Sequence, residues 1–286
     1  MLKRLFRPTN LRLRLVVGVL LAAGFCIQCT SSDPTRSSQL VADISGASPS
    51  IAPAQQQAEL EKLAASDHVA LLKELLAHYN DHCRAYTCTL VKHERINGQL
   101  QNEQWIDVKF MEKPFSVSMH WTKNSPLGDR VLYVEGKYNG NMLVNPANAL
   151  LLKLVGTVQR QPESQEAMAN TLRPVTQFGL RPMLESLLSI YELAAQRKEG
   201  ASHFKGYQEV AGVKAMVLQR DLPARGDYPA KTTIWYLDPQ RLVPLGLVAY
   251  DWSDQLICSY IFTDIKLDAD LSEEDFTPQA NQMKLR

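Results

Sequence analysis

The chain has 286 residues, which is enough for one large domain or two small ones with a substantial buried core. Hydrophobic residues make up 45% of it and charged residues 21%, the balance of an ordinary folded protein. The first 14 residues carry five of the 31 Lys and Arg residues and none of the 30 Asp and Glu residues, so the remainder is slightly acidic. This composition argues against a nucleic-acid partner, because such a protein needs a basic face.

The N-terminus predicts export. Its five cations precede an uncharged apolar run over residues 15–27, the pattern of a secretory signal peptide. A permanent membrane span usually needs about 20 apolar residues, so this run is short for one. We expect residues 1–29 to be a signal peptide or membrane anchor and the protein to reach the periplasm.

Two cysteines close the apolar run. Cys29, and less clearly Cys26, is a candidate for lipidation, because an apolar run that ends at Cys before a Ser- and Thr-rich stretch resembles a bacterial lipoprotein signal. That signal requires a small residue before the Cys, whereas Phe25 precedes Cys26 and Gln28 precedes Cys29. Lipidation, ordinary cleavage and retention as an uncleaved anchor stay open. Residues 30–55 are rich in Ser, Ala and Pro and predict a flexible tether, which leaves one domain over 56–286.

Periodicity in the domain predicts helix, strands, helix, strands. Apolar residues recur at helical spacing over 55–82, with a break near Ser66 where Asp67 can cap a second segment. Asn97-Gly98 between two alternating runs predicts a hairpin. One apolar stripe predicts a helix over 179–197. The expected strands lie at 86–96, 105–110, 115–121, 131–135, 141–145, 215–220, 231–237, 245–252 and 259–265. This order is typical of an antiparallel α+β domain. A Gly-rich phosphate loop is missing from the sequence, and we expect no nucleotide or other cofactor.

Several separated blocks resemble a bacterial family of exported proteins catalogued as domain of unknown function 1571. They cover residues 86–95, 108–110, 114–117, 131–136 and 175–180. The final third is similar to the wider superfamily of lipoprotein carriers, LolA and its relatives, at residues 235–238, Pro244, 250–251 and 271–276. The resemblance implies an open half-barrel, a curved antiparallel sheet whose concave face is covered by helices.

A loosely covered half-barrel would leave an apolar cavity for acyl chains, since each buried methylene contributes about 0.8 kcal/mol. The alternative is that the same side chains form a plain filled core. Lys92 and Glu94 share one face of their strand, so they either reach inward, where Glu94 paired with Lys92 or Lys109 would orient a headgroup, or decorate the solvated strand end. The candidate cavity residues are Trp105, Phe110, Phe115, Val117, Met119, Trp121, Leu184, Leu188 and Trp235.

Signals for catalysis and metal binding are weak. A Gly-x-Ser-x-Gly elbow and a His-Glu-x-x-His motif are both missing, and His93-Glu94 is followed by Asn97. His78, His82 and Cys83 have spacing that would allow zinc, but an exposed polar helix end explains them as well. In an oxidising compartment one cysteine pair can bridge; we expect Cys88–Cys258 slightly ahead of Cys83–Cys88.

These observations favour a non-enzymatic envelope protein that binds a lipid, a lipoprotein or another apolar ligand. Its partners would be that ligand and, through the N-terminus, the membrane. The second hypothesis is a protein interaction or scaffold module with a filled core and no ligand. The third is an envelope hydrolase or metal enzyme built on His78, His82 and a cysteine.

Overall fold

The computed structural model describes residues 53–126, 128–146 and 148–285. The region Pro53–Arg286 forms one compact unit, and we describe it by itself. The expected signal, lipidation sites and most of the tether lie outside the described residues.

The domain opens with two helices, α1 (Pro53–Ser66) and α2 (His68–His82). The break between them falls at Asp67, whose side chain accepts a hydrogen bond of 2.9 Å from the Ala70 amide. An Asp at this position satisfies one of the free amides at the start of a helix, so the predicted cap is confirmed.

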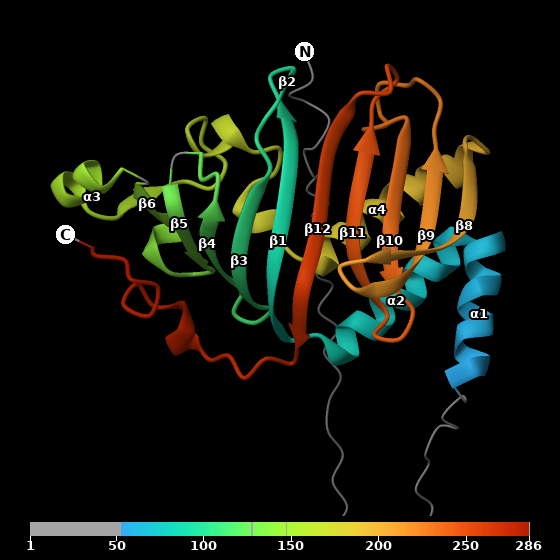
Figure 1. The fold of residues 1–286 in the computed structure, drawn as a ribbon, viewed down its shortest axis with the longest axis horizontal. Helices are drawn as coiled ribbons and strands as arrows, with labels where there is room; N and C mark the ends of the chain where they lie inside the picture. The colour runs from blue at the N-terminus through green and yellow to red at the C-terminus, as the bar shows by residue number, and fades with distance from the viewer. Residues whose placement is uncertain (1–52, 127, 147, 286) are drawn as a thin grey trace, which may run out of the picture. The chain divides into compact units, whose positions relative to one another are not determined.

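A curved, open antiparallel sheet forms the body of the domain (Figure 1). Its order is β7-β6-β5-β4-β3-β1-β12-β11-β10-β9-β8, and the short β2 pairs with β1 across the Asn97-Gly98 turn. The first and last long strands thus meet in the middle of the sheet. The α+β class and the open curved sheet are confirmed. The strands are β1 (Ala85–Ile96), β2 (Gln99–Leu100), β3 (Gln104–Met111), β4 (Ser116–Lys123), β5 (Gly128–Val134), β6 (Met142–Pro146), β7 (Val158–Arg160), β8 (Ala201–Val210), β9 (Val213–Asp221), β10 (Thr232–Asp238), β11 (Val243–Tyr250) and β12 (Leu256–Leu267).

Helices α2 and α4 (Leu180–Arg197) lie across one face of β9–β12, which we call the inner face (Figure 1). The apolar stripe of α4 buries Leu184 and Tyr191 against this face. The Trp235 indole donates a hydrogen bond of 3.2 Å to the Tyr191 hydroxyl, and the Tyr86 hydroxyl accepts one of 3.2 Å from the Leu180 amide. Apolar burial and these polar links fix the position of α4 on the sheet.

The half of the sheet that contains β3–β6 has a different cover. Leu172, Val175 and Phe178, from the segment 161–179, pack against the inner apolar cluster. This segment has only the short turns η2 (Ala167–Asn170) and η3 (Val175–Gln177). On the outer face, residues 268–285, with η4 (Glu273–Phe276), pack Phe276 and Met283 against β5 and β6. Helices therefore cover only part of the inner face, whereas the family resemblance implied that helices cover the whole concave face.

The elements without a counterpart in the sequence prediction include η1 (Tyr138–Gly140), α3 (Ala149–Val155), β7 and β8. The edge strand β8 is largely polar and alternates between exposed and half-buried residues, so its sequence has little apolar periodicity.

Candidate functional site

The inner face of β1 carries an apolar row that ends in two charged residues. Alternate side chains of a strand share a face, and Tyr86, Cys88 and Leu90 belong to the inner apolar cluster. Lys92 and Glu94 continue this row inward. Lys92 is 7% exposed and Glu94 2%, and the Lys92 Nζ lies 3.1 Å from the Glu94 Oε2. Of the two sequence-based alternatives, the structure has the inward one. We call these two residues the inner ion pair.

The inner ion pair has few hydrogen bonds for its depth. Glu94 Oε1 accepts a short bond of 2.5 Å from the Tyr260 hydroxyl on β12. Lys92 Nζ donates to the Thr171 hydroxyl at 3.4 Å, near the limit of a hydrogen bond. Glu94 Oε2 is buried and receives no hydrogen bond of good geometry from the described residues. Buried charged groups are normally fully hydrogen-bonded, so this pair retains capacity for a further polar partner.

Neighbouring strands add an amide, a thiol and a phenol beside the pair. Gln104 stands opposite Lys92 on β3 and accepts a hydrogen bond of 2.8 Å from the Trp121 indole. Cys258 stands opposite Glu94 on β12, and burial raises the pKa of its thiol to about 12. Burial, together with Cys258 and Glu94, raises the pKa of Tyr260 well above its usual value. Both groups are therefore protonated at neutral pH, and Tyr260 can donate to Glu94.

The segment 161–179, which we call the inner cover, roofs this site. The Phe178 ring lies 6.1 Å from that of Phe110 and 6.3 Å from that of Phe262, measured between centroids. The inner cover ends at Gly179, whose φ of +126° favours glycine. A Cβ there would come within 3.3 Å of the Phe110 ring. The glycine thus allows the cover to approach the sheet closely before α4 begins.

Most of the predicted cavity residues lie on the inner face. Phe110, Val117, Leu184 and Trp235 are fully buried or nearly so, and Met119 is 9% exposed. Phe115 and Trp121 are half-buried against the same cluster. Trp105 differs: it is 38% exposed and lies on the outer face, because it neighbours the inward Gln104 and Ile106 on β3. Its assignment to the cavity is corrected.

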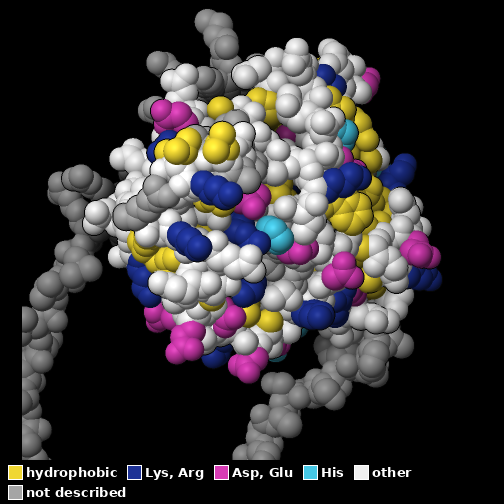
Figure 2. Space-filling model, turned by 60° about the vertical axis from the view of Figure 1, so that its left-hand side comes forward, with side chains coloured by type: hydrophobic (Ala, Val, Ile, Leu, Met, Phe, Trp, Pro, Cys, Tyr) yellow, Lys and Arg dark blue, Asp and Glu magenta, His cyan; other side chains and the backbone are white. Residues whose placement is uncertain are grey.

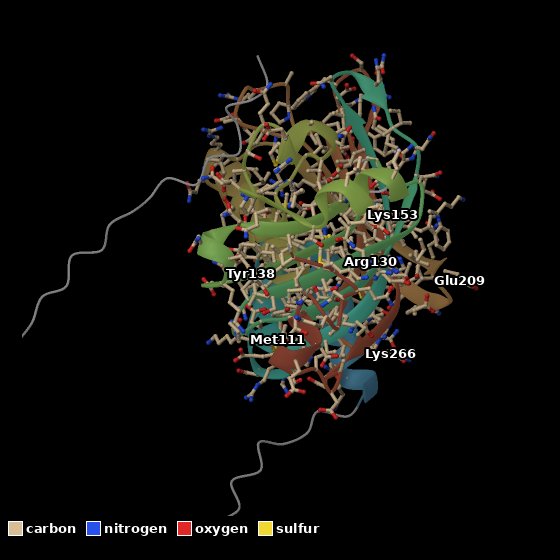
Figure 3. The ribbon with its side chains drawn as sticks, turned by 90° about the vertical axis from the view of Figure 1, so that its left-hand side faces the viewer. Met111, Arg130, Tyr138, Lys153, Glu209 and Lys266 are labelled. Atoms are coloured by element: carbon tan, nitrogen blue, oxygen red, sulfur yellow. The ribbon has the colours of Figure 1, made fainter. Side chains whose placement is uncertain are left out.

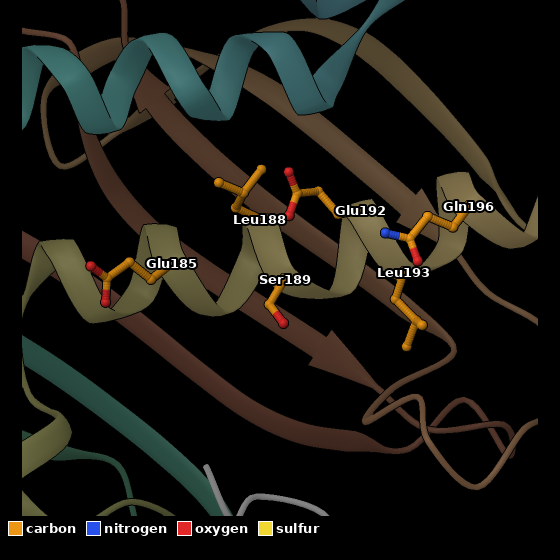
Figure 4. Close-up of a pocket in the computed structure, with 6 residues that line it drawn as sticks. All are labelled: Glu185, Leu188, Ser189, Glu192, Leu193 and Gln196. Carbon is orange, nitrogen blue, oxygen red and sulfur yellow. The ribbon is translucent and has the colours of Figure 1, made fainter. Parts of the chain in front are cut away.

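The helix-covered half of the inner face is filled by side chains. Trp235, Leu218 and Met216 are completely buried there. The hollow along α4 is on the helix's outer side, where Glu185, Leu188 and Ser189 line it with Glu192, Leu193 and Gln196 (Figure 4). Leu188 therefore lines a surface hollow beside α2. Leu184, by contrast, is buried in the core. A second hollow lies against 272–280.

The proposed partnership of Glu94 with Lys109 does not occur. Lys109 is on the outer face of β3, where its Nζ lies 3.5 Å from Asp275 Oδ1 of η4. The Cys88–Cys258 disulfide is corrected as well, since all three described cysteines are free and buried. Cys258 faces Glu94, six residues along β1 from Cys88, a distance of about 20 Å at the rise of a strand. A disulfide needs Cα atoms within about 7 Å.

The histidines of α2 do not form a metal site with Cys83. The His78 and His82 rings stack at 4.3 Å, and a His82 ring nitrogen bonds the His78 carbonyl at 3.0 Å. Cys83 is buried in the core, where burial raises the pKa of its thiol to about 11. Within 53–126, 128–146 and 148–285, no three His, Cys, Asp or Glu side chains are grouped to hold a metal.

Sequence reasoning missed Tyr260, Thr171 and Gln104. Each touches Lys92 or Glu94, or a direct neighbour of theirs, from another part of the chain. Tyr260 and Gln104 depend on the register of β1 with β12 and β3, which periodicity within one strand does not fix.

The family model of the "protein of unknown function" DUF1571 matches residues 83–285. The chain belongs to the DUF1571 family. The predicted family resemblance is confirmed over both halves of the sheet and the inner ion pair. A search of curated proteins gave no match.

Solved structures with similar folds are distant in sequence. The MucA/MucB complex of Pseudomonas aeruginosa matches with 16% identity and a TM-score of 0.45 over 77% of this chain and 64% of that one. Mycobacterium tuberculosis lipoprotein LppX matches with 10% identity and a TM-score of 0.42, over 72% and 99%. A LolA superfamily protein from Nitrosomonas europaea matches with 8% identity and a TM-score of 0.31, over 73% and 98%. The chain spans less than two thirds of the MucB chains that it matches.

The part of the chain that the structure describes contains no helix both long and apolar enough to cross a bilayer.

Proposed function

We propose that this protein is a non-enzymatic binder of a lipid, a lipoprotein acyl group or another apolar ligand in the cell envelope. The ligand would lie between β1, β3 and β4 and the inner cover, with its polar end at the inner ion pair. The observation that carries the proposal is a buried, incompletely hydrogen-bonded charge pair at the end of an apolar row, under a cover without regular structure.

The inner cover is suited to displacement by a ligand. Its backbone hydrogen bonds include local turns, such as Phe178 to the Val175 carbonyl and Met168 to the Ser164 carbonyl. Leu172, Val175 and Phe178 are half-buried, so they form fewer apolar contacts than the fully buried face of α4. An acyl chain that replaces these side chains on Phe110, Val117 and Met119 would gain about 0.8 kcal/mol for each methylene buried.

The inner ion pair would select the headgroup. Lys92 supplies ammonium donors for an anionic headgroup such as a carboxylate. Glu94 Oε2, which is paired with Lys92 but receives no hydrogen bond of good geometry, can accept from a donor group where the headgroup carries one. Charge-assisted hydrogen bonds are about twice as strong as neutral ones, which would make the headgroup contribution specific.

A filled core favours a second candidate, a protein interaction module without a ligand. Trp235 and its neighbours occupy the helix-covered half completely. Under this alternative the inner cover would be a fixed part of the core, and the partner would bind elsewhere.

The first experiment is native mass spectrometry of the full chain purified from its own envelope, before and after delipidation. A bound mass of a few hundred daltons that leaves with solvent supports the binder. The delipidated chain is then titrated with a dansyl-labelled fatty acid and its methyl ester. We expect Lys92→Met/Glu94→Gln to weaken binding of the free acid about tenfold and to leave binding of the ester unchanged.

A matched control is Lys109→Met/Asp275→Asn, which removes an ion pair of similar length from the outer face. This control variant should leave the affinity for both probes unchanged. A wild-type chain that takes up neither probe, and carries no ligand from its envelope, contradicts the proposal and favours the interaction module.

A further inference from the structure

A cluster of exposed apolar side chains lies where β6, α3 and the last described residues meet. Leu150 is 68% exposed, Leu154 64%, Val155 44% and Leu285 46%. These are four of the seven large apolar side chains that are most exposed among the described residues. Scattered exposed apolar residues are ordinary, but a contiguous group marks a contact surface. We call these four residues the α3 tip.

Two distant parts of the sequence form the tip. The Asn148 side chain accepts a hydrogen bond of 2.9 Å from the Leu150 amide at the start of α3. After α3, the Thr157 amide donates to the Lys284 carbonyl at 3.0 Å, and the Lys284 amide donates to the Thr157 hydroxyl at 2.9 Å. These bonds hold Leu285 beside the end of α3. Figure 1 shows α3 projecting at the end of the sheet opposite to α1.

Cationic side chains accompany the tip. Lys153 is exposed on α3 itself, and Lys284 is exposed in the C-terminal segment next to Leu285. Figure 3 shows Lys153 and Arg130 on the same side of the molecule, and Figure 2 shows hydrophobic groups beside Lys and Arg on this side. Arg130 is half-buried and donates to Gln282, and the neighbouring Asp129 is half-buried. Lys153 and Lys284 therefore place exposed positive charge directly beside the tip.

We propose that the α3 tip binds the surface of an anionic lipid bilayer. Leucine side chains that enter the headgroup region while lysines stay among anionic headgroups are the arrangement of interfacial membrane contacts. Each Lys or Arg near an anionic surface contributes about 1 kcal/mol. Four side chains are a small patch beside the roughly 800 Å² per partner of a stable protein interface, which favours a lipid surface over a protein.

The contact goes beyond the proposed ligand binding and would hold this end of the half-barrel against a membrane. The inner ion pair and inner cover are separate from the tip, so uptake of acyl probes does not test it. The two proposals can fail independently.

The test places an environment-sensitive dye at the tip of the full chain. Leu150→Cys is labelled with a nitrobenzoxadiazole dye in a Cys26→Ser/Cys29→Ser background, since the three remaining cysteines are buried. Vesicles contain two parts phosphatidylcholine to one part phosphatidylglycerol, or phosphatidylcholine alone. We expect dye emission to rise several-fold with the anionic vesicles and to fall back with added salt. Lys153→Gln/Lys284→Gln should weaken the response more than tenfold, about fivefold for each lysine.

The control label is at Leu100→Cys, an exposed leucine (41%) on β2 at the other end of β1 from Ala85. Its emission should not change. An unchanged signal at position 150 overturns the proposal. An equal rise at both positions also overturns it, because that outcome reports only attachment through the N-terminus. A rise at position 150 without vesicles that grows with protein concentration also overturns it and indicates a second copy as the occupant.

Discussion

The two halves of the inner face are built from similar strands but covered in different ways. Over β9–β12, helix α4 presents a regular apolar stripe, and Trp235 is fully buried with its indole bonded to Tyr191. Over β3 and β4, the inner cover has only short turns, and Trp121 is half-buried with its indole bonded to Gln104. A regular helix covers the first half and an irregular segment covers the second, with a charged pair beneath it. Under the proposed function, the first half maintains the fold and the second exchanges its cover for a ligand.

The largest expected effect separates these two tryptophans. Trp235→Ala should lower the free energy of unfolding by about 4 kcal/mol, because a large fully buried side chain leaves a cavity. Trp121→Ala should cost about half as much, because its site is partly exposed and its cover can collapse into the space. Urea denaturation of both variants measures the difference. Equal losses would show that the two halves are packed alike.

A somewhat smaller effect is expected at the inner ion pair. Glu94→Gln should cost about 3 kcal/mol of unfolding free energy, since it leaves the buried Lys92 without its counter-charge. Lys92→Met/Glu94→Gln should recover most of that loss, because it removes both charges together. Denaturant unfolding of the single and double variants decides this. A single variant as stable as the wild type would mean that water or another group already compensates Lys92.

Sequence reasoning predicts features set by neighbouring residues better than features set by contacts between distant parts of the chain. Asp67 and Asn97-Gly98 were readable because capping and tight turns depend on neighbouring residues. Lys92 and Glu94 were readable as sharing a face, but their burial depends on Thr171 and Tyr260, which lie far away in the chain. Trp105 was misassigned because its size outweighed its place in the alternation of β3. The polar Ser118 is buried by Asn281 of the C-terminal segment, which no local pattern reveals.

The smallest effect concerns the helix-covered half and pH. His68 is buried, its Nε2 lies 2.7 Å from the Ala64 carbonyl, and burial lowers its pKa. The unfolded chain then binds a proton more readily than the folded one. The contribution of His68 to the free energy of unfolding is therefore fully present above about pH 6.5 and is lost as the pH falls below that value. We expect a loss of up to about 1.4 kcal/mol per pH unit, absent in His68→Gln, measured by thermal unfolding between neutral and mildly acidic pH. A variant with the same pH dependence as the wild type would assign the effect to other groups.

Hydrogen exchange on the delipidated full chain, with and without a fatty acid, tests the central claim most directly. It compares the amides of the inner cover, 161–179, with those of α4. We predict that the inner cover exchanges faster than α4 in the free protein. Fatty acid should then change exchange in the inner cover and in β1 near Lys92 and Glu94, and leave α4 unchanged. Protection of the inner cover equal to that of α4, and unaffected by fatty acid, would contradict the account and identify the cover as a permanent part of the core.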